Sequence, residues 1–432
     1  MKKLCCFVSG LIFFSVSVAQ GTAAVLVIPK EPSSQAAGMS AERLRRIDHL
    51  LKQHIDSGWM NGAVALVIRN GKVAYYEAAG YDDVTTKRPL KKDGIFRMAS
   101  QTKAITSVAV MMLYEEGKFL LDEPVSKYIP QFKKPRVLEK FNASDTSYTT
   151  VPAKREITIR DLLTHTSGIG YAQIGSREAN ALYAKAGVEA GISMDKILLG
   201  DKMKILGSLP LLHQPGERWT YGLNTDLLGY LVEVTSGMSL AEFFKQRIFE
   251  PLGMKDTYFY VPKEKHNRLV QLYTEDTLTG KVMKAPHQSR FGKNFNPDYP
   301  NTEGTYYSGG GGLSGTIYDY AIFLQMMLNG GEYNGKRFLS RNTVRMMTMN
   351  QINDLWLDKK KFGLGFSITT DKASAMLPTP EGVFEWSGAF ATTYWVDPKE
   401  KMVALLYRNI YASRHGNLSD FFKVAVYQAI ND

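Results

Sequence analysis

The chain is nearly free of cysteine. Among its 432 residues only Cys5 and Cys6 are cysteines, and both lie in the first segment, 1–19. This segment carries lysines near its start, continues with a short apolar stretch and ends in small residues, which is the pattern of a signal peptide cleaved after Ala19. We therefore expect an exported protein, periplasmic or secreted, whose mature chain has no disulfide, no thiol nucleophile and no cysteine metal site.

The sequence also lacks long hydrophobic runs and long runs of one charge. The apolar part of segment 1–19 is too short to span a bilayer comfortably, so we expect no stable membrane insertion after cleavage; an uncleaved anchor is the alternative. The formal net charge is +11, but the lysines and arginines are scattered. Scattered basic residues are typical of a solvated surface and do not favour a nucleic-acid partner. We expect a small-molecule partner instead, and the sequence predicts no oligomeric state.

Strand-like patterns occur at both ends of the chain and helical patterns in its middle. Asn70-Gly71 lies between two apolar runs, which is the strongest short signal for a β-hairpin, and a second hairpin is expected around Pro398. The economical architecture is an α/β (α+β) fold, with one antiparallel sheet made from both ends, flanked by helices, and an inserted helical domain. The predicted parts are a signal peptide at 1–19, a linker at 20–40, an α/β sandwich domain at 41–105 and 300–432, and a mainly helical domain at 106–299.

Two stretches of the middle region, 132–156 and 275–307, look long and irregular. Loops of this length inside compact domains are usually functional, so we expect them to rim the active site. The second stretch ends in several aromatic residues, and we hypothesise on that basis that the substrate is apolar or carries a ring.

A serine and a lysine stand at the start of a nearly unbroken apolar helix. Ser100 and Lys103 are three residues apart and so lie on one helix face, within reach of each other. A lysine buried among apolar groups has a lowered pKa and can accept a proton, and a serine at a helix start lies where the helix dipole favours negative charge. The pair is typical of a nucleophile and its activator; a lysine on the helix surface is the simpler alternative.

Two further stretches could complete a catalytic site. Tyr221 follows a Pro-Gly turn and precedes a helical pattern, where its side chain could point into a cleft and carry protons. Ser387-Gly388, at the edge of a predicted strand, could present the backbone N–H of Ala389 to an oxyanion. The alternatives are that Tyr221 is an aromatic at the rim of the core and that Trp386 is an ordinary strand aromatic.

The Ser-x-x-Lys helix, the tyrosine loop and the strand motif ending in glycine occur in a fixed order along the chain. Together with "ITIRDLLTHTSGI", "YSGGGGLSGTIYDYAIFLQMMLNGG" and "LDEPVSKYIP", this order resembles the serine beta-lactamase and penicillin-binding-protein superfamily over about residues 40 to 430. The resemblance implies a beta-lactamase/transpeptidase-like fold, which agrees with the architecture expected above.

Departures from the superfamily pattern point to one branch. Class C beta-lactamases carry Tyr-x-Asn and then Lys-Thr-Gly. Here Leu223 stands where that asparagine would be, Asn224 comes one residue too late, and Trp386 replaces the lysine. The stretch that begins at Tyr221, "YGLNTDLLG", together with "WSG" and "YWVDP", is similar to the family VIII carboxylesterases.

This resemblance implies a serine carboxylesterase that uses an acyl-enzyme and no metal or organic cofactor. Ser100 would attack the carbonyl of a small-molecule ester or lactam-like substrate, and Lys103 and Tyr221 would take its proton and pass it to the leaving alcohol. The backbone N–H groups of Ser100 and Ala389 would hold the oxyanion. The residues expected to contact the substrate are Trp386, Ser387, Gly388 and Asn224.

Other bases and other activities are alternatives. His165 could act as the base, but its stretch "LLTHTSG" usually braces the helical domain in this superfamily, so we expect a structural role for it and for His213. A Gly-x-Ser-x-Gly elbow is not present at Ser100, because Met98 and Thr102 occupy the glycine positions. The activities left open are a beta-lactamase or D-Ala-D-Ala carboxypeptidase, an acyltransferase with the same acyl-enzyme, and a non-catalytic binder of cell-wall fragments.

Overall fold

The computed structural model describes residue 1 and residues 27–188, 191–276, 278–290, 293–356 and 359–431. The predicted signal peptide and the first part of the predicted linker fall on residues 2–26, outside the described residues. The later part of that linker packs against the fold, since Ile28, Ala37 and Met39 are buried. In the part of the chain that is described, no helix is both long and apolar enough to cross a membrane.

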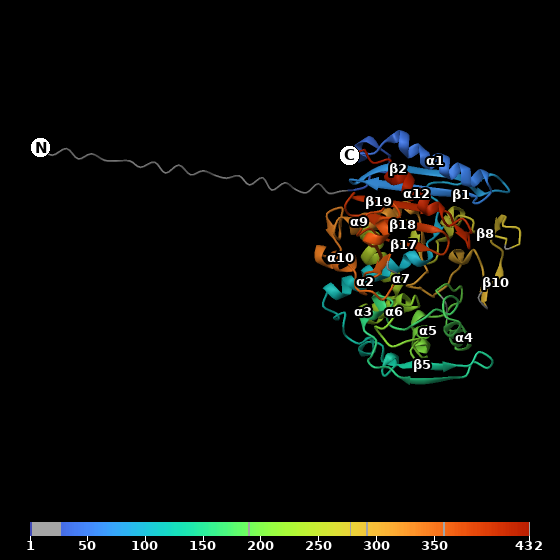
Figure 1. Ribbon diagram of the computed structural model, residues 1–432, viewed down its shortest axis with the longest axis vertical. Helices are drawn as coiled ribbons and strands as arrows, with labels where there is room; N and C mark the ends of the chain where they lie inside the picture. The colour runs from blue at the N-terminus through green and yellow to red at the C-terminus, as the bar shows by residue number, and fades with distance from the viewer. Residues whose placement is uncertain (2–26, 189–190, 277, 291–292, 357–358, 432) are drawn as a thin grey trace.

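An antiparallel sheet made from both ends of the described chain lies in the upper half of the molecule in the view of Figure 1. Its strand order is β15-β16-β17-β18-β19-β1-β2-β3, and its paired neighbours run antiparallel. The hairpins predicted around Asn70-Gly71 and Pro398 join β1 to β2 and β18 to β19, which confirms the expected sheet. The strands are β1 (Gly62–Arg69), β2 (Lys72–Asp83), β3 (Arg88–Pro89), β15 (Lys360–Phe362), β16 (Ser367–Thr369), β17 (Phe384–Gly388), β18 (Thr392–Asp397) and β19 (Met402–Tyr407).

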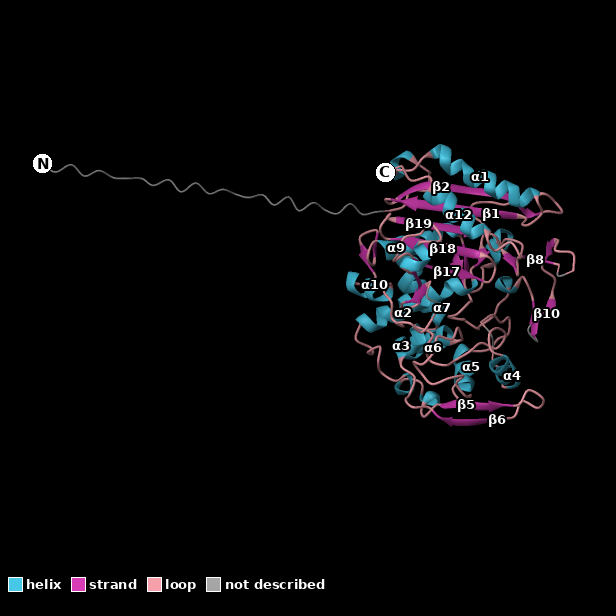
Figure 2. Cartoon of the chain, in the orientation of Figure 1, coloured by secondary structure: helices cyan, strands magenta, loops and turns pink. Residues whose placement is uncertain are grey.

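Helices cover both faces of this sheet (Figure 2). The helices α1 (Ala41–Asp56) and α12 (Leu418–Tyr427) pack on the outer face, and the predicted cap Ser40 accepts the N–H of Arg43 at the start of α1. Successive residues of β1, such as Leu66 and Val67, belong to hydrophobic cores on opposite faces, as the alternation of a strand requires.

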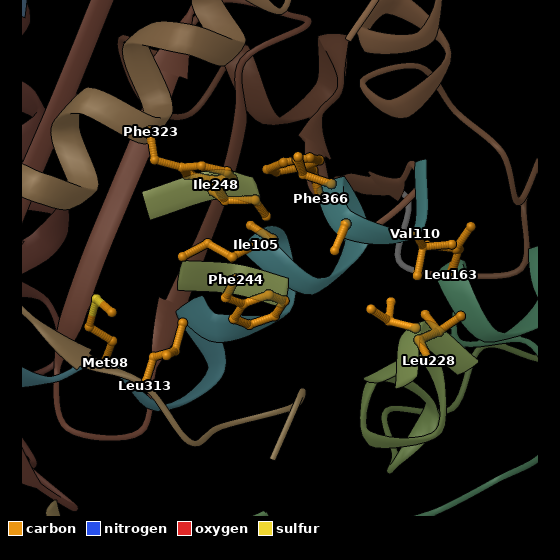
Figure 3. Close-up of a cluster of buried hydrophobic side chains, with 14 of the residues drawn as sticks. Met98, Ile105, Val110, Leu163, Leu228, Phe244, Ile248, Leu313, Phe323 and Phe366 are labelled. Atoms are coloured by element: carbon orange, nitrogen blue, oxygen red, sulfur yellow. The ribbon is translucent and has the colours of Figure 1, made fainter. Parts of the chain in front are cut away.

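The larger hydrophobic core lies on the inner face, around α2 (Thr102–Glu115) and α9 (Ile317–Leu328) (Figure 3). Every residue of α2 from Thr102 to Leu113 is buried, which explains the nearly unbroken apolar run after Ser100. In Figure 3 Ile105 of α2 lies beside Phe244, and Phe323 lies beside Ile248. The helix that carries Lys103 is therefore fixed along its length by packing.

Most of the other elements come between β3 and β15 in the chain. The helices are α3 (Ile159–Leu163), α4 (Arg177–Lys185), α5 (Leu199–Leu206), α6 (Asn224–Ser236), α7 (Leu240–Phe244), the π-helical turn η5 (Lys245–Phe249), α8 (Glu250–Leu252), α10 (Arg341–Met347), α11 (Asp371–Ser374) and the 3-10 turns η1 (Gln35–Ala37), η2 (Ala99–Gln101), η3 (Val125–Lys127), η4 (Pro130–Phe132), η6 (Lys263–Arg268) and η7 (Tyr299–Asn301). The short strands are β4 (Phe96–Arg97), β5 (Arg136–Phe141), β6 (Tyr148–Pro152), β7 (Thr257–Tyr258), β8 (Tyr273–Glu275), β9 (Val282–Lys284), β10 (Gln288–Arg290), β11 (Lys293–Phe295), β12 (Ser314–Gly315), β13 (Glu332–Tyr333), β14 (Lys336–Arg337) and β20 (Ile410–Tyr411).

The stretches expected to be irregular contain strands, and this expectation was wrong. Residues 132–156 form the hairpin β5–β6, and 275–307 contains β9, β10 and β11. In β5–β6 the register shifts between Leu138 and Lys140, so the period-two pattern of side chains is interrupted in the sequence. Figure 2 places this hairpin at the end of the molecule opposite α1.

Candidate active site

Ser100 lies in the 3-10 turn η2, directly before α2. Ala99 has a φ of 45°, a left-handed conformation that is rare for alanine, so the chain turns sharply just before the nucleophile. The turn is held from two sides, because the Tyr407 hydroxyl donates to the side-chain oxygen of Gln101 at 2.5 Å and the Tyr320 hydroxyl donates to the Gln101 carbonyl at 2.8 Å. Ser100 is thereby fixed between the sheet and α2.

The end of β17 lies against this turn. A Cβ at Gly388 would lie 2.2 Å from the carbonyl oxygen of Met98, so the strand can approach this closely only with a glycine. Ser387 and Ala389, on either side of Gly388, are exposed. The predicted strand motif is therefore next to the nucleophile, and the oxyanion hole of the Ser100 and Ala389 N–H groups stays a prediction.

Lys103 is 3% exposed, and its Nζ contacts three oxygen atoms. It donates to the Gly310 carbonyl at 2.6 Å and lies 2.9 Å from the Tyr171 hydroxyl and 3.3 Å from the Ser100 hydroxyl. Its Nζ is also 4.7 Å from the centre of the Tyr221 ring. Among the described residues no carboxylate lies within salt-bridge distance of Lys103, so oxygen atoms and an aromatic face solvate the buried amine.

Tyr221 lies on the other side of Ser100, with its hydroxyl 2.6 Å from the serine Oγ. The loop that carries it is pressed against a neighbouring segment, because a Cβ at Gly222 would lie 2.0 Å from the carbonyl oxygen of Ile169. Only glycine fits directly after Tyr221, and the helix α6 starts soon after it. These contacts fix the tyrosine at hydrogen-bond distance from the nucleophile.

The glycine-rich stretch 308–312 positions the carbonyl that accepts from Lys103. It packs closely on α6, since a Cβ at Gly310 would lie 2.3 Å from a carboxylate oxygen of Asp226. Asp226 is fully buried and accepts a hydrogen bond from the Ser308 hydroxyl. Burial raises the pKa of the Asp226 carboxyl, although the nearby Lys103 and Ser308 act in the opposite direction. This supporting role of the stretch was not predicted from the sequence.

Tyr171 is a second unpredicted member of the site. Its hydroxyl lies 2.9 Å from the Nζ of Lys103, and its ring centre is 5.3 Å from that of Tyr221. Burial raises the pKa of the Tyr171 hydroxyl well above its ordinary value, and the neighbouring Tyr221 and Asp226 raise it further. Tyr171 therefore keeps its proton and acts as a neutral hydrogen-bonding group.

Asn224, which was predicted to contact the substrate, lies behind the site instead. Its side chain is fully buried, its Nδ2 lies 2.9 Å from the Nδ1 of His165, and its Oδ1 accepts from the Ser167 hydroxyl. Both ends of the amide are therefore bonded inside the protein. We correct the prediction: Asn224 positions neighbouring residues and presents no group to a substrate.

The two histidines occupy bracing positions. Burial lowers the pKa of His165 well below 6.5, as does the charge of Lys103, so the imidazole stays neutral. His213 lies 2.9 Å from the Gln214 carbonyl through Nδ1 and 2.8 Å from the Thr220 hydroxyl through Nε2. Among the described contacts neither histidine is hydrogen-bonded to Ser100.

The structure thus brings Ser100, Lys103 and Tyr221 together, with Trp386 nearby. The Trp386 ring is half-buried, and its centre lies 5.6 Å from that of Tyr221. A serine hydroxyl flanked by an amine and a phenol can lose its proton to them as it attacks a carbonyl carbon. The arrangement is suited to acyl transfer through a covalent intermediate.

A beta-lactamase family profile matches residues 47–426. The chain belongs to the beta-lactamase family. It is 32% identical over 372 residues to protein Rv1367c of Mycobacterium tuberculosis, which covers 82% of this chain and 87% of that protein. It is 30% identical over 410 residues to Esterase EstB of Burkholderia gladioli, which covers 92% of this chain and 98% of the esterase.

Solved structures of the beta-lactamase fold are similar over most of the chain. EstCE1, described as a hydrolase with promiscuous acyltransferase activity, aligns with a TM-score of 0.75 and 25% identity, over 89% of this chain and 99% of EstCE1. The predicted membership of the serine beta-lactamase and penicillin-binding-protein superfamily and the predicted beta-lactamase/transpeptidase-like fold are confirmed.

Proposed function

We propose that this serine hydrolase is an exported esterase that cleaves small carboxylic esters through an acyl-enzyme on Ser100. The observation that carries the proposal is the geometry at Ser100, with Tyr221 at 2.6 Å and Lys103 at 3.3 Å, next to a strand that presents Trp386. A lysine on that strand would pair with the carboxylate of a beta-lactam or of a peptide C-terminus, and an indole ring cannot. The similarity to EstB and EstCE1 supports an ester substrate.

In the first step the Oγ of Ser100 bonds to the ester carbonyl carbon. Its proton moves to the Tyr221–Lys103 pair, and Lys103 stabilises the negative charge that develops as the O–H bond lengthens. The bond between the carbonyl carbon and the alcohol oxygen then breaks, and Tyr221 returns the proton to that oxygen. In the second step water attacks the acyl carbon and loses a proton to the same pair. The bond between that carbon and the Ser100 Oγ then breaks, the pair returns the proton to Oγ, and the acid is released.

The test is a paired assay of the chain from residue 20 onward and its Ser100→Ala variant, with Ser144→Ala as a matched control in the exposed turn between β5 and β6. Each protein receives p-nitrophenyl acetate, butyrate and octanoate and, separately, a chromogenic cephalosporin. We expect fast ester cleavage by the parent chain and the control, little lactam turnover, and at least a roughly thousandfold loss in Ser100→Ala. Equal activity of Ser100→Ala, or lactam turnover that exceeds ester turnover, would contradict the proposal.

Transfer to an alcohol competes with hydrolysis at the same acyl-enzyme. Adding an alcohol acceptor and measuring new ester against free acid separates the two activities. More ester than acid would make acyltransferase the better description. Export is tested with the full chain in a bacterial host, where the proposal expects periplasmic or secreted protein whose first residue is Gln20.

A further inference from the structure

Three tryptophans from distant segments meet beside Tyr221. Trp219 precedes α6, Trp356 lies between α10 and β15, and Trp386 is on β17. Trp219 and Trp356 stack with ring centres 4.3 Å apart and planes 20° from parallel. Trp219 is also nearly parallel to Tyr221, at 6.1 Å and 17°. A row of three near-parallel rings therefore leads away from the nucleophile.

Trp386 and Phe362 complete this group. Trp386 lies 5.6 Å from Tyr221 and 6.3 Å from Trp356, with its plane tilted by 44° and 48°. Phe362 is 1% exposed and contacts all three tryptophans, whereas the tryptophans are only partly buried. We call Trp219, Trp356 and Trp386 the tryptophan cluster. Phe362, which packs against it, is buried, and each of the three tryptophans keeps some exposed surface.

The charged side chains of β15 and β17, the strands that carry Phe362 and Trp386, are all paired. On β17 the carboxylate of Glu385 contacts both Lys360 and Lys423. On β15 Lys361 pairs with Asp354 at 2.7 Å. These two strands therefore present no unpaired charge to a group bound at the cluster, which supports an uncharged group there.

The proposed reaction sets which part of the ester reaches the cluster. Tyr221 returns a proton to the leaving alcohol, so the alcohol oxygen must lie within hydrogen-bond reach of the Tyr221 hydroxyl. The group attached to that oxygen then lies on the same side as the rings next to Tyr221.

We infer that the tryptophan cluster binds the alcohol part of the ester and that this part carries a flat, uncharged ring. The inference rests on the proposed esterase function and adds its substrate class. Flat aromatic rings stack on indole faces, whereas saturated rings of similar size can pack there but lack the additional stabilisation of an aromatic pair. Of the three tyrosines behind the hypothesis of a ring-bearing substrate, Tyr299 and Tyr306 are each only 2% exposed and packed in the interior. The third, Tyr307, is partly buried and lies against Phe259 and Tyr260, apart from the tryptophan cluster.

The test compares two acetate esters, benzyl acetate and cyclohexylmethyl acetate, which differ only in the alcohol ring. Ethyl benzoate and ethyl cyclohexanecarboxylate place the same rings on the acyl side. The variants are Trp356→Leu, Trp356→Phe, which restores a ring, and the control Trp59→Leu, whose tryptophan stacks on His415 at 4.4 Å, outside the tryptophan cluster. Thermal unfolding of each variant shows that it is folded.

We expect kcat/KM of the parent chain to be about threefold to tenfold higher for benzyl acetate than for cyclohexylmethyl acetate. The ratio should fall close to one in Trp356→Leu, recover in part in Trp356→Phe and persist in Trp59→Leu, while the acyl-side ratio does not follow this pattern. Ester cleavage without this ratio, or a ratio that survives Trp356→Leu, would overturn the inference and leave the esterase function standing. Cleavage of no ester at all would remove the proposed function, and the inference with it.

Discussion

At the scale of single residues, Lys103 has oxygen atoms in place of a counter-ion. A carbonyl oxygen can only accept, so the contact with Gly310 uses one N–H of the amine and aims the rest of the group at Tyr171 and Ser100. The position of the amine, and so its distance from the nucleophile, depends on residues that do not touch the substrate.

Tyr171→Phe tests this dependence. The variant keeps the ring and removes the hydroxyl that lies 2.9 Å from Lys103, so the buried amine loses one of its three partners. We expect kcat to fall about tenfold to a hundredfold with a small change in KM, and the pH profile of kcat to shift, because the amine is less well held in the acyl-transfer step. Tyr183→Phe is the matched control, since that buried hydroxyl accepts from the Gly170 N–H and does not contact Lys103. An unchanged kcat and pH profile in Tyr171→Phe would show that the contact is incidental.

How well a site residue could be predicted depended on how local its signal is. Ser100 and Lys103 are three positions apart where η2 runs directly into α2, so the spacing alone places them together. Tyr171 and Gly310 lie 68 and 207 positions from Lys103 and reach it only through tertiary packing. Asn224 was misassigned because nothing in the sequence says which side chains at the start of α6 turn inward.

At the scale of elements, one carboxylate joins three of them. Glu385 of β17 accepts from Lys360 of β15 and, at 2.6 Å, from Lys423 of α12. Burial acts to raise the pKa of Glu385, but the two lysines outweigh it and hold the pKa below its ordinary value. The strand that carries Trp386 and Gly388 is thereby anchored to its neighbours.

Glu385→Gln should destabilise the protein by about 3 kcal/mol near neutral pH, because it leaves two partly buried lysines side by side without their counter-charge. The pKa of Glu385 is lower in the folded protein than in the unfolded chain. Its contribution to the free energy of unfolding is therefore fully present above its ordinary pKa and is lost as the pH falls through the lowered value. Urea unfolding measures the loss. The control is Asp56→Asn, which breaks a pair whose side chains are 73% and 59% exposed and should cost much less. Equal losses in the two variants would mean that Glu385 is not an anchor.

The two hairpins of the large sheet were predictable because their sequence signals are local, as is the spacing of Ser100 and Lys103. Asn-Gly at 70–71 fixes a tight turn by its own backbone preference, and Ser40 caps α1 through a bond to a residue three positions away. The β5–β6 hairpin lacks both a tight turn and a regular register, so only the folded chain reveals it.

At the scale of the whole molecule, the site is assembled from parts that are far apart in the chain. Ser100 comes from η2 and Lys103 from the start of α2, Tyr171 and Tyr221 from the helical middle, and Trp386 from the sheet. The site therefore forms only when the middle region has packed against a sheet closed by both ends of the described chain. The domain boundaries at 105 and 300 stay a prediction; the first falls inside α2 and the second shortly before the glycine-rich stretch 308–312.

Asp319 affects the pH dependence of the stability of the fold in the opposite direction to Glu385, because its pKa is raised and not lowered. Its carboxylate accepts from the Asp256 N–H and the Thr257 hydroxyl, and burial raises its pKa from 3.8 to about 6. Between these values the unfolded chain has lost the proton and the folded chain still holds it, so stability falls as the pH rises through this window, by about 3 kcal/mol in total.

Asp319→Asn keeps an acceptor oxygen and removes the ionisation. Urea unfolding at pH 4.5 and 7.5 should show the variant gaining stability relative to the parent chain as the pH rises, with the exposed Asp371→Asn as the control. A difference between variant and parent that stays constant over this range would mean that Asp319 is already ionised in the folded protein.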